Sequence, residues 1–439
     1  MVEGQELPDL RTTPPGPRSR ELSARLARVE SPAFGARRAA RAETSAADQS
    51  PIVYERGAGA NVWDVDGNRY ADMVAGFGAL PLGHAPDVAR RALLAQQDKL
   101  WLALGDVYAT EAKVALTEQL AALYPEPGAR VLLGLSGADA VTAALKTAVL
   151  ATGRAGVLAF TGGYHGLSYA PLAACGLNPS FREPFAPQLG RHVTFAPFPT
   201  GEADVEDCFI HIQNALVSGQ IGAVLVEPLL GRGGCVVPPP LFLRRLRDLC
   251  DRAGALLVAD EIWTGLGRSG SMLMSVSQGV LADVVCVGKG LGGGLPISAC
   301  IGSAKVMAPW GERGGSSIHT ATHFGFPLAC ATALATLGKI RDEGIADRAR
   351  RVGDDFIELL RGRLRGPRVR EVRGRGLMVG IELTGGAADA LAASRALLER
   401  GWIVLTGGVR GDVITLTPPL TIGNELLSAF AAAASEALA

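Results

Sequence analysis

The sequence predicts an α/β protein in which a mostly parallel sheet is covered by helices on both faces. Between about residues 85 and 335, short apolar runs that suit buried strands alternate with longer stretches of helical periodicity. Strands that alternate with helices in this way form parallel sheets, because each parallel neighbour is reached through a crossover helix. The expected strands are 130–134, 155–160, 221–226, 255–259 and 282–287, and the expected helices include 138–152 and 241–253.

The two ends of the chain differ from this central region, 85–335. Residues 1–50 are expected to form a tail or helical arm, with one amphipathic helix at 19–29. Residues 51–84 are expected to contribute short strands, including a hairpin at the Asp-Gly-Asn turn near Gly67. Together with residues 336–439 they would form a smaller α/β domain. Its C-terminal part is expected to contain a helix at 347–363, strands at 377–383 and 413–416, and a helix from 424.

Composition excludes several classes of protein. Lys and Arg together number 43, as do Asp and Glu, so no charge excess favours nucleic acid or an anionic membrane. No apolar run approaches the roughly 20 residues of a membrane span, and the N-terminus lacks a secretory signal. The seven cysteines are scattered without CxxC pairs, and no histidine has a metal-ligand partner at a suitable spacing. A cytoplasmic protein without a metal site is the expectation.

Two residues at strand ends carry the strongest chemical signal in the chain. Lys289 follows the run 282–287 and opens a glycine-rich turn, and Asp260 closes the preceding strand. A lysine that reaches from a strand end into a pocket loses hydration, which lowers the pKa of its amine and makes it nucleophilic. An aspartate in such a place can hold a protonated ring nitrogen. Together they are the two protein groups that pyridoxal phosphate requires, although either one alone would suit an ordinary surface lysine or strand-terminal acid.

Three further residues are expected at the same edge of the sheet. Ser136 begins a Ser-Gly-Ala turn before an Ala-rich helix, which suits a phosphate, although Ser136 also suits a simple helix cap. Tyr164 follows the next strand and can stack on a planar ring or simply pack in a turn. Glu227 ends the strand before that of Asp260. Ligands of parallel α/β sheets bind beyond the carboxyl ends of the strands, so these residues are expected to line one crevice.

With these residues in view, the chain resembles the class III (ω-amino-acid type) pyridoxal-phosphate-dependent aminotransferases of fold type I. The resemblance covers roughly residues 11 to 438 and includes the spacing of 29 positions between Asp260 and Lys289. The fold that it implies has a large domain with a mostly parallel seven-stranded sheet sandwiched by helices, and a smaller α/β domain made from both termini. The matching segments are Asp64-Val-Asp-Gly-Asn-Arg-Tyr, Ser136-Gly-Ala-Asp-Ala-Val, Gly163-Tyr-His-Gly, Val226-Glu-Pro, Asp260-Glu-Ile-Trp-Thr-Gly, Lys289-Gly-Leu-Gly and His319-Thr-Ala-Thr-His.

The resemblance implies a role for each candidate residue. Lys289 would form the Schiff base with pyridoxal 5′-phosphate and shuttle the proton, while Asp260 would keep the pyridine nitrogen protonated. Tyr164 would stack on one face of the ring and Ile262 would press on the other. Thr322 would reach the phosphate of the neighbouring subunit, which implies a homodimer with shared sites. The other implied cofactor contacts are Ser136, Gly137, Ala138, His165 and Glu227.

Three positions depart from the pattern of many relatives. Trp263 replaces a glutamine that contacts the phenolic oxygen of the cofactor, so the sequence predicts loss of that hydrogen bond. Arg232 and Thr415 replace the glutamate and arginine that form an ion pair in relatives using 2-oxoglutarate. Arg232 or Arg410 could then bind a carboxylate, and either one could equally be a solvated surface residue. If the substrate carries no α-carboxylate, Phe77 and Trp263 would suit an apolar amine.

The expected function is therefore the transfer of a terminal or other primary amino group to an oxo acid, more pyruvate-like than 2-oxoglutarate. A lyase acting on an amino phosphate, a decarboxylase or a racemase remains an alternative, because such enzymes share the same motifs. A catalytically silent binding protein is disfavoured, because Lys289, Asp260 and Thr322 are all present.

Overall fold

The computed structural model describes residues 4–312 and 314–439, so residues 1–3 of the predicted N-terminal arm lie outside the described part. The chain divides into two compact units. We call Asp87–Asp347 the large unit, and Met1–Pro86 with Arg348–Ala439 the terminal unit. The boundary that the sequence suggested at 335/336 falls inside α12 (Pro327–Asp342), whereas the structure keeps this helix within the large unit, where it packs on α4 (Asp87–Gln97).

The large unit contains the predicted seven-stranded sheet, and its strand order is β4-β10-β9-β8-β7-β5-β6. The pairs β9–β8, β8–β7, β7–β5 and β5–β6 are parallel, whereas β10 is antiparallel to both of its neighbours. The strands are β4 (Arg130–Gly134), β5 (Gly156–Phe160), β6 (Val193–Ala196), β7 (Ile221–Val226), β8 (Leu256–Asp260), β9 (Val284–Val287) and β10 (Ser298–Gly302).

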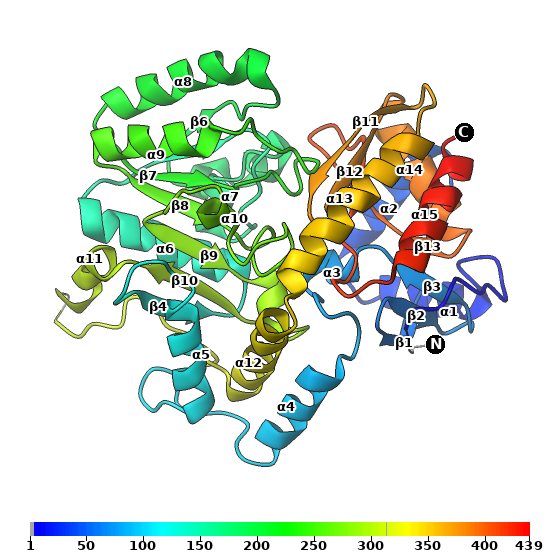
Figure 1. Ribbon diagram of the computed structural model, residues 1–439, viewed down its shortest axis with the longest axis horizontal. Coiled ribbons are helices and arrows are strands. Elements are labelled where there is room, and N and C mark those ends of the chain that lie inside the picture. Colours follow the sequence, from blue (N-terminus) through cyan, green and yellow to red (C-terminus); the bar gives the residue numbers. More distant parts are fainter. Residues whose placement is uncertain (1–3, 313) are drawn as a thin grey trace. The chain divides into compact units, whose positions relative to one another are not determined.

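Alternate side chains of these strands enter two separate hydrophobic clusters, one on each face of the sheet. In β8, Leu257 and Ala259 join one cluster while Val258 joins the other. The first cluster includes side chains from α5 (Glu111–Ala121), α8 (Val205–Val217), α9 (Phe242–Ala253) and α12, and the second includes those of α6 (Gly137–Thr152). Figure 1 shows α8 and α9 on one side of the strands and α6 on the other. Burial on both faces explains why the strands have no polar alternation.

The remaining elements of the large unit are short. They are α7 (Tyr169–Ala173), α10 (Met274–Ser277), α11 (Ala304–Met307) and the 3₁₀ turns η1 (Pro179–Phe181), η2 (Glu183–Gln188), η3 (Glu202–Asp204), η4 (Lys289–Gly292) and η5 (Ala308–Glu312). Among the described residues, no helix is both long enough and apolar enough to cross a membrane. The seven cysteines, all within the described part, are buried and form no disulfide.

The terminal unit contains two four-stranded sheets, with strand orders β1-β2-β3-β13 and β11-β12-β15-β14. The predicted hairpin is confirmed, because β2 and β3 pair antiparallel across the turn at Gly67. The predicted helix at 19–29 is α1 (Pro17–Ala27), and a second helix follows that the sequence did not suggest, α2 (Pro32–Ser45). None of the residues of α2 is buried. The helix therefore has no apolar stripe that packs on a core, which is the pattern from which an amphipathic helix is predicted.

The other elements of the terminal unit follow the predicted order. The helix predicted at 347–363 is α13, which begins at Ile345, and the chain ends with the predicted closing helix, α15. The elements are β1 (Tyr54–Ala58), β2 (Asn61–Asp64), β3 (Arg69–Asp72), α3 (Ala75–Gly78), α13 (Ile345–Arg363), β11 (Val369–Arg375), β12 (Met378–Leu383), α14 (Gly386–Leu398), β13 (Trp402–Ile403), β14 (Leu405–Gly407), β15 (Val413–Leu416) and α15 (Asn424–Ala437).

Candidate active site

Lys289 lies two residues beyond the end of β9 and begins η4. Its backbone is left-handed, with φ of 37°, which is uncommon for a residue other than glycine. Removal from water lowers the pKa of the Lys289 amine to about 8; Asp260 and Glu227 oppose this effect and Arg232 adds to it. An amine with this pKa is partly neutral near pH 7 to 8, as a nucleophile or a general base must be.

Asp260 ends β8, the strand that pairs with β9, so Asp260 and Lys289 lie at the same edge of the sheet. The Asp260 carboxylate is only 4% exposed. Its Oδ2 is 2.7 Å from Nδ1 of His165, and its Oδ1 accepts a hydrogen bond from the backbone N–H of Ile262 at 3.1 Å. With Nδ1 of His165 as the donor, the histidine orients the carboxylate. A buried, oriented carboxylate is what a protonated ring nitrogen requires as its partner.

Glu227 follows β7, the next strand of the same edge. Its two carboxylate oxygens accept hydrogen bonds from the backbone N–H groups of Tyr164 at 2.7 Å and Gly231 at 3.0 Å. Burial raises the pKa of Glu227 to about 7, while the interaction with the nearby His165 opposes the rise. Glu227 therefore ties together the loops that carry Tyr164 and Arg232, a role that strand-end position alone did not reveal.

The start of α6 lies at this edge as well. Ser136 is the N-cap: its hydroxyl accepts a hydrogen bond from Asp139 N at 3.3 Å, and the Asp139 carboxylate accepts one from Ser136 N at 3.0 Å. Ser136 therefore caps the helix, and its contact with a phosphate stays a prediction. The first N–H groups of the helix, those of Gly137 and Ala138, have no partner within the helix and form an anion site by their geometry and dipole. A Cβ at Gly137 would lie 2.7 Å from Cδ1 of Ile262, so glycine is what allows the Ile262 side chain to pack this closely against the start of the helix.

Two aromatic rings face the cationic side chains of the site. Nζ of Lys289 is 4.4 Å from the centre of the Trp263 indole, and the guanidinium carbon of Arg232 is 4.8 Å from the centre of the Tyr164 ring. Trp263 is only 5% exposed, and its Nε1–H makes no hydrogen bond within the part of the chain that the structure describes. The sequence predicted loss of the hydrogen bond that a glutamine makes at this position, and it did not reveal that the indole N–H is an available donor.

The structure places other predicted site residues on further segments. Thr322 is exposed on the segment before α12, and its carbonyl oxygen lies near Gly105. Phe77 belongs to the terminal unit, where it is 51% exposed with a left-handed backbone. Thr415, in β15, is buried, and its hydroxyl has no hydrogen-bond partner among the described residues.

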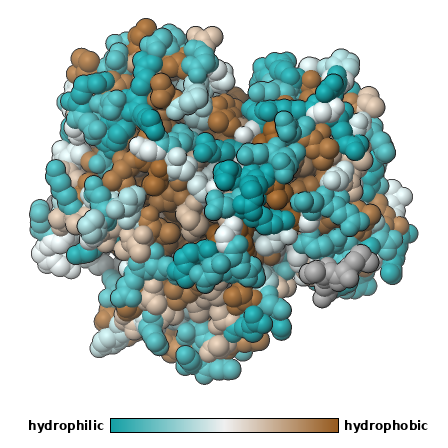
Figure 2. All heavy atoms as spheres, viewed as in Figure 1, coloured by the Kyte–Doolittle hydropathy of each residue, from teal (hydrophilic) through white to brown (hydrophobic). Residues whose placement is uncertain are grey.

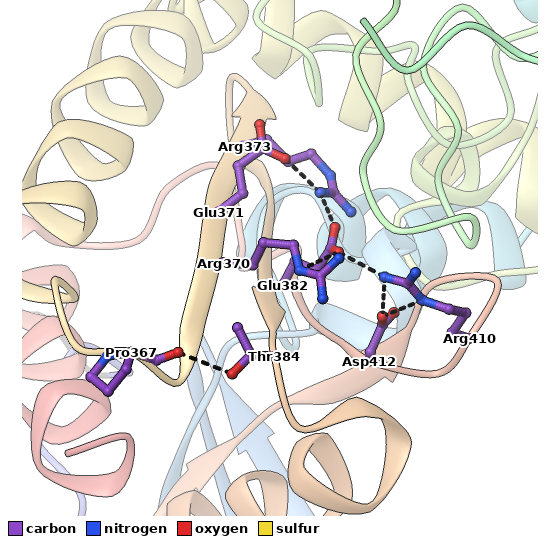
Figure 3. Close-up of polar contacts among 8 residues, drawn as sticks. All are labelled: Pro367, Arg370, Glu371, Arg373, Glu382, Thr384, Arg410 and Asp412. Carbon is purple, nitrogen blue, oxygen red and sulfur yellow. Dashed lines mark hydrogen bonds and ion pairs between the residues drawn. The ribbon is translucent and has the colours of Figure 1, made fainter.

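Arg410, the second candidate for carboxylate binding, is engaged within the terminal unit. Its Nη2 lies 2.9 Å from a carboxylate oxygen of Glu382 and 2.7 Å from one of Asp412, and its Nε donates to Asp412 at 2.8 Å. Figure 3 shows the Arg410 guanidinium between these two carboxylates. The acidic neighbours raise the pKa of Arg410. Its donors are thus already shared by two anions.

The residues of the large unit fit pyridoxal 5′-phosphate in chemistry and in space. Lys289 supplies an amine for the aldehyde, Asp260 a carboxylate for the ring nitrogen, and the start of α6 an anion site for the phosphate. The unpaired Nε1–H of Trp263 is a donor that suits an oxygen of the bound cofactor. Fold and site together define a pyridoxal-phosphate enzyme built on a mostly parallel α/β sheet.

Comparisons with known proteins agree with this class. The family model described as aminotransferase class-III matches residues 43–438. An acetylornithine aminotransferase of Methanosarcina acetivorans is 35% identical over 377 residues, which cover 86% of this chain and 89% of that protein. The ornithine aminotransferase structure from Toxoplasma gondii has a TM-score of 0.81 at 32% identity, covering 88% of this chain and 90% of that one.

A PLP-bound amine transaminase from an uncultivated Pseudomonas species also has a TM-score of 0.81, at 31% identity, and covers 89% of this chain and 94% of that one. The chain belongs to the class-III aminotransferase family. It is an aminotransferase of fold type I, and pyridoxal 5′-phosphate is its cofactor.

Proposed function

We propose that this aminotransferase moves a terminal or other primary amino group from a donor amine to a small, pyruvate-like oxo acid. The observation that carries the proposal is the placement of Lys289 and Asp260 at the ends of adjacent strands, with the lysine pKa lowered to about 8. When bound, the cofactor supplies an electron sink for the electron pair at the substrate carbon. Asp260 would keep the ring nitrogen of the bound cofactor protonated, and Nζ of Lys289 would accept and return the proton of the substrate carbon.

Arg232 is the proposed holder of the acceptor carboxylate. It lies beside Tyr164 and close enough to Lys289 to lower the pKa of that amine. It makes no ion pair with any residue that the structure describes, and a guanidinium with available donors binds a carboxylate bidentately. An arginine at this position, with Thr415 in place of the distal arginine, favours an acceptor with one carboxylate over 2-oxoglutarate. Arg410 is less suited, because its Nε and Nη2 already interact with Glu382 and Asp412.

A homodimer with shared sites is part of the proposal. The segment between α4 and α5 carries large apolar side chains that are strongly exposed in the single chain, and Figure 2 shows apolar residues among polar ones on the surface. Surface of this kind is typical of an interface between subunits. Thr322 would complete the phosphate site of the partner subunit. The exposed residues of the segment are Leu100, Trp101, Leu102, Leu104, Val107 and Tyr108. The buried cysteines without disulfides suit a reducing compartment, and the cytoplasm is the proposed location.

The visible spectrum of the purified protein tests the reaction directly. A panel of ω-amino acids including N-acetylornithine, diamines, aryl-alkyl amines and amino-alkyl phosphates is added without an acceptor. We expect one class of amine to bleach the yellow band stably, and pyruvate to restore it better than 2-oxoglutarate. If 2-oxoglutarate restores the yellow band and pyruvate does not, the proposal of a pyruvate-like acceptor is wrong. A persistent band with release of phosphate, carbon dioxide or an inverted enantiomer would replace transamination by the lyase, decarboxylase or racemase alternative.

Replacement of Lys289 tests the central residue. Lys289→Ala removes the only amine that we assign to the cofactor aldehyde, so we expect turnover to fall at least about 10³-fold. The cofactor should remain bound noncovalently, because the start of α6 and Asp260 are unchanged. Borohydride reduction followed by mass spectrometry of the peptides checks the linkage: the wild type should carry the cofactor on the Lys289 peptide. A fully active Lys289→Ala variant would contradict the assignment.

A further inference from the structure

Trp263 contacts the side-chain nitrogen of Lys289. The replacement of a glutamine by tryptophan at this position does not by itself suggest this contact. The indole ring lies over the nitrogen of Lys289, with Nζ 4.4 Å from the ring centre. The ring is 5% exposed, so the contact is shielded from water. Its Nε1–H makes no hydrogen bond within the described chain. Because burying such a donor unpaired is unfavourable, hydrogen bonding within the chain does not account for the position of the ring.

The backbone that leads into Trp263 is anchored at two residues. Asp260 Oδ1 accepts the N–H of Ile262 at 3.1 Å. Glu261 is fully buried, and its carboxylate accepts hydrogen bonds from the N–H groups of Met274 at 2.7 Å and Ser275 at 2.8 Å. These bonds hold the turn after β8 and therefore hold the indole in place beside Lys289.

An aromatic face attracts a cation, and the attraction grows when water is excluded. The nitrogen of Lys289 is cationic both as a free ammonium group and as the protonated link to the cofactor. The other charged groups that act on it are Asp260 and Glu227, which favour the cation, and Arg232, which disfavours it together with burial. The indole adds a stabilising contribution that involves no charge of its own and so does not disturb the carboxylates.

We propose that Trp263 is a positioning residue that holds the nitrogen of Lys289 against its indole face and stabilises the cationic form of that nitrogen. This rests on the proposed linkage of Lys289 to the cofactor. The consequence is that the linking nitrogen keeps its proton to a higher pH than it would beside an aliphatic side chain. A protonated link is the form that a donor amine attacks readily, so the indole face extends the pH range of the enzyme upward.

The test is a pH titration of the visible spectrum of the holoenzyme, without substrate. Trp263→Leu removes the aromatic face, so we expect the protonated form of the link to be lost at a pH lower by about 0.5 to 1.5. Trp263→Phe keeps a weaker face and should move the midpoint in the same direction by a smaller amount. Circular dichroism and thermal melting establish that each variant is folded.

Fluorinated tryptophans provide a second measurement that preserves the shape of the side chain. Fluorine withdraws electron density from the indole face and weakens its attraction for a cation, so mono-, di- and trifluorotryptophan should lower the midpoint progressively. The chain contains five tryptophans, and the Trp263→Phe variant grown with the same analogues is the matched control, in which no progression is expected.

Equal midpoints for Trp263→Leu, Trp263→Phe and the wild type, or a fluorinated series without progression, would overturn the inference and leave Trp263 as a space-filling residue. Failure of the proposed function would give a different result. If Lys289 is not linked to the cofactor, the visible spectrum of the wild-type holoenzyme will contain no band that titrates with pH. The two failures are therefore distinguishable in one experiment.

Discussion

Arg232 is the residue on which the proposed oxo-acid acceptor depends. The guanidinium lies over Tyr164 and has donors that no carboxylate in the described chain occupies. We predict that Arg232→Ala raises the KM for pyruvate about 10- to 100-fold, the loss expected for a charged hydrogen bond, with a smaller effect on kcat. Arg232→Lys should recover part of the affinity, because it keeps the charge but not the bidentate geometry.

Arg410 is the comparison for this measurement. Its donors are engaged by Glu382 and Asp412, so Arg410→Ala should leave the KM for pyruvate little changed. Steady-state kinetics of both variants with one donor amine and varied pyruvate decide between the two arginines. A large rise in KM for Arg410→Ala alone would reverse the assignment.

Glu227 links the site to the pH dependence of stability. Burial raises the pKa of this carboxyl group from 4.5 to about 7, so between those values the folded chain binds a proton that the unfolded chain does not. The proton on Glu227 therefore adds to the free energy of unfolding. This stabilisation is fully present below about pH 4.5, is lost as the pH rises through 7, and amounts to at most about 3 kcal/mol. The pKa of Lys289 is lowered from 10.5 to about 8, so Lys289 changes the free energy of unfolding mainly above pH 8. It therefore does not hide the effect of Glu227 between pH 4.5 and 7.

We predict that Glu227→Gln flattens this dependence. The variant should be less stable overall by about 1–3 kcal/mol, because its amide cannot accept hydrogen bonds from both Tyr164 N and Gly231 N. Its melting temperature should nevertheless fall less than that of the wild type between pH 5 and 8. Melting curves of both proteins across this range are the measurement, and parallel curves would show that Glu227 does not titrate there.

At the scale of elements, the start of α6 is the part most sensitive to added volume. Gly137→Ala would place a Cβ 2.7 Å from Cδ1 of Ile262, so either the helix or Ile262 must move. We predict a loss of about 1–3 kcal/mol of stability. Cofactor binding should also weaken if Ile262 presses on the cofactor ring, as the resemblance implies. Titration of the apoenzyme with pyridoxal 5′-phosphate and thermal melting measure the two effects.

Gly362 in α13 provides the matched control. A Cβ there meets nothing within 4 Å, and alanine favours a helix by about 0.5–1 kcal/mol. Gly362→Ala should therefore stabilise the protein slightly and leave cofactor affinity unchanged. Equal behaviour of the two alanine variants would remove the steric argument for Gly137.

The helices and strands differed in how well they could be predicted from the sequence. The strand β8 and the helix α9 were predictable because a continuous apolar run and a helical apolar period are local features. The antiparallel direction of β10 was not, because direction depends on which strands pair and not on the residues of one strand. The integrity of α12 across residue 335 likewise depends on its packing against α4.

At the scale of the whole molecule, the shared site can be tested by mixing two inactive variants. In a homodimer of Lys289→Ala no site has its amine, and in one of Thr322→Ala each phosphate site would lack the hydroxyl. If Thr322 acts across the interface, a mixed dimer contains one intact site, made of Lys289 from one chain and Thr322 from the other. We therefore predict that unfolding and refolding the mixed variants restores activity, up to about a quarter of that of the wild type at equal mixing, because half of the dimers are then mixed.

Refolding each variant separately is the control, and size measurement by light scattering establishes that dimers form. Activity that does not rise on mixing would mean that Thr322 serves its own chain or that the sites are not shared. A monomer in solution would overturn the homodimer and leave the exposed apolar segment near Trp101 without its proposed partner.

The sequence by itself determined the order of the elements and the position of Lys289, Asp260 and Glu227 at strand ends. These follow from local patterns: apolar runs form buried strands, and the carboxyl ends of parallel strands meet at one edge. The family of the chain was also evident from these residues and their spacing, and the match over residues 43–438 bears this out.

Only the tertiary structure decided what each side chain contacts. The hydrogen bonds from Tyr164 N and Gly231 N to Glu227, the indole of Trp263 over Lys289, and the two carboxylates at Arg410 had no separate signal in the sequence. The physical reason is that side-chain contacts depend on distances of a few ångströms between separate segments, and such distances are set by packing and not by the local pattern of residues.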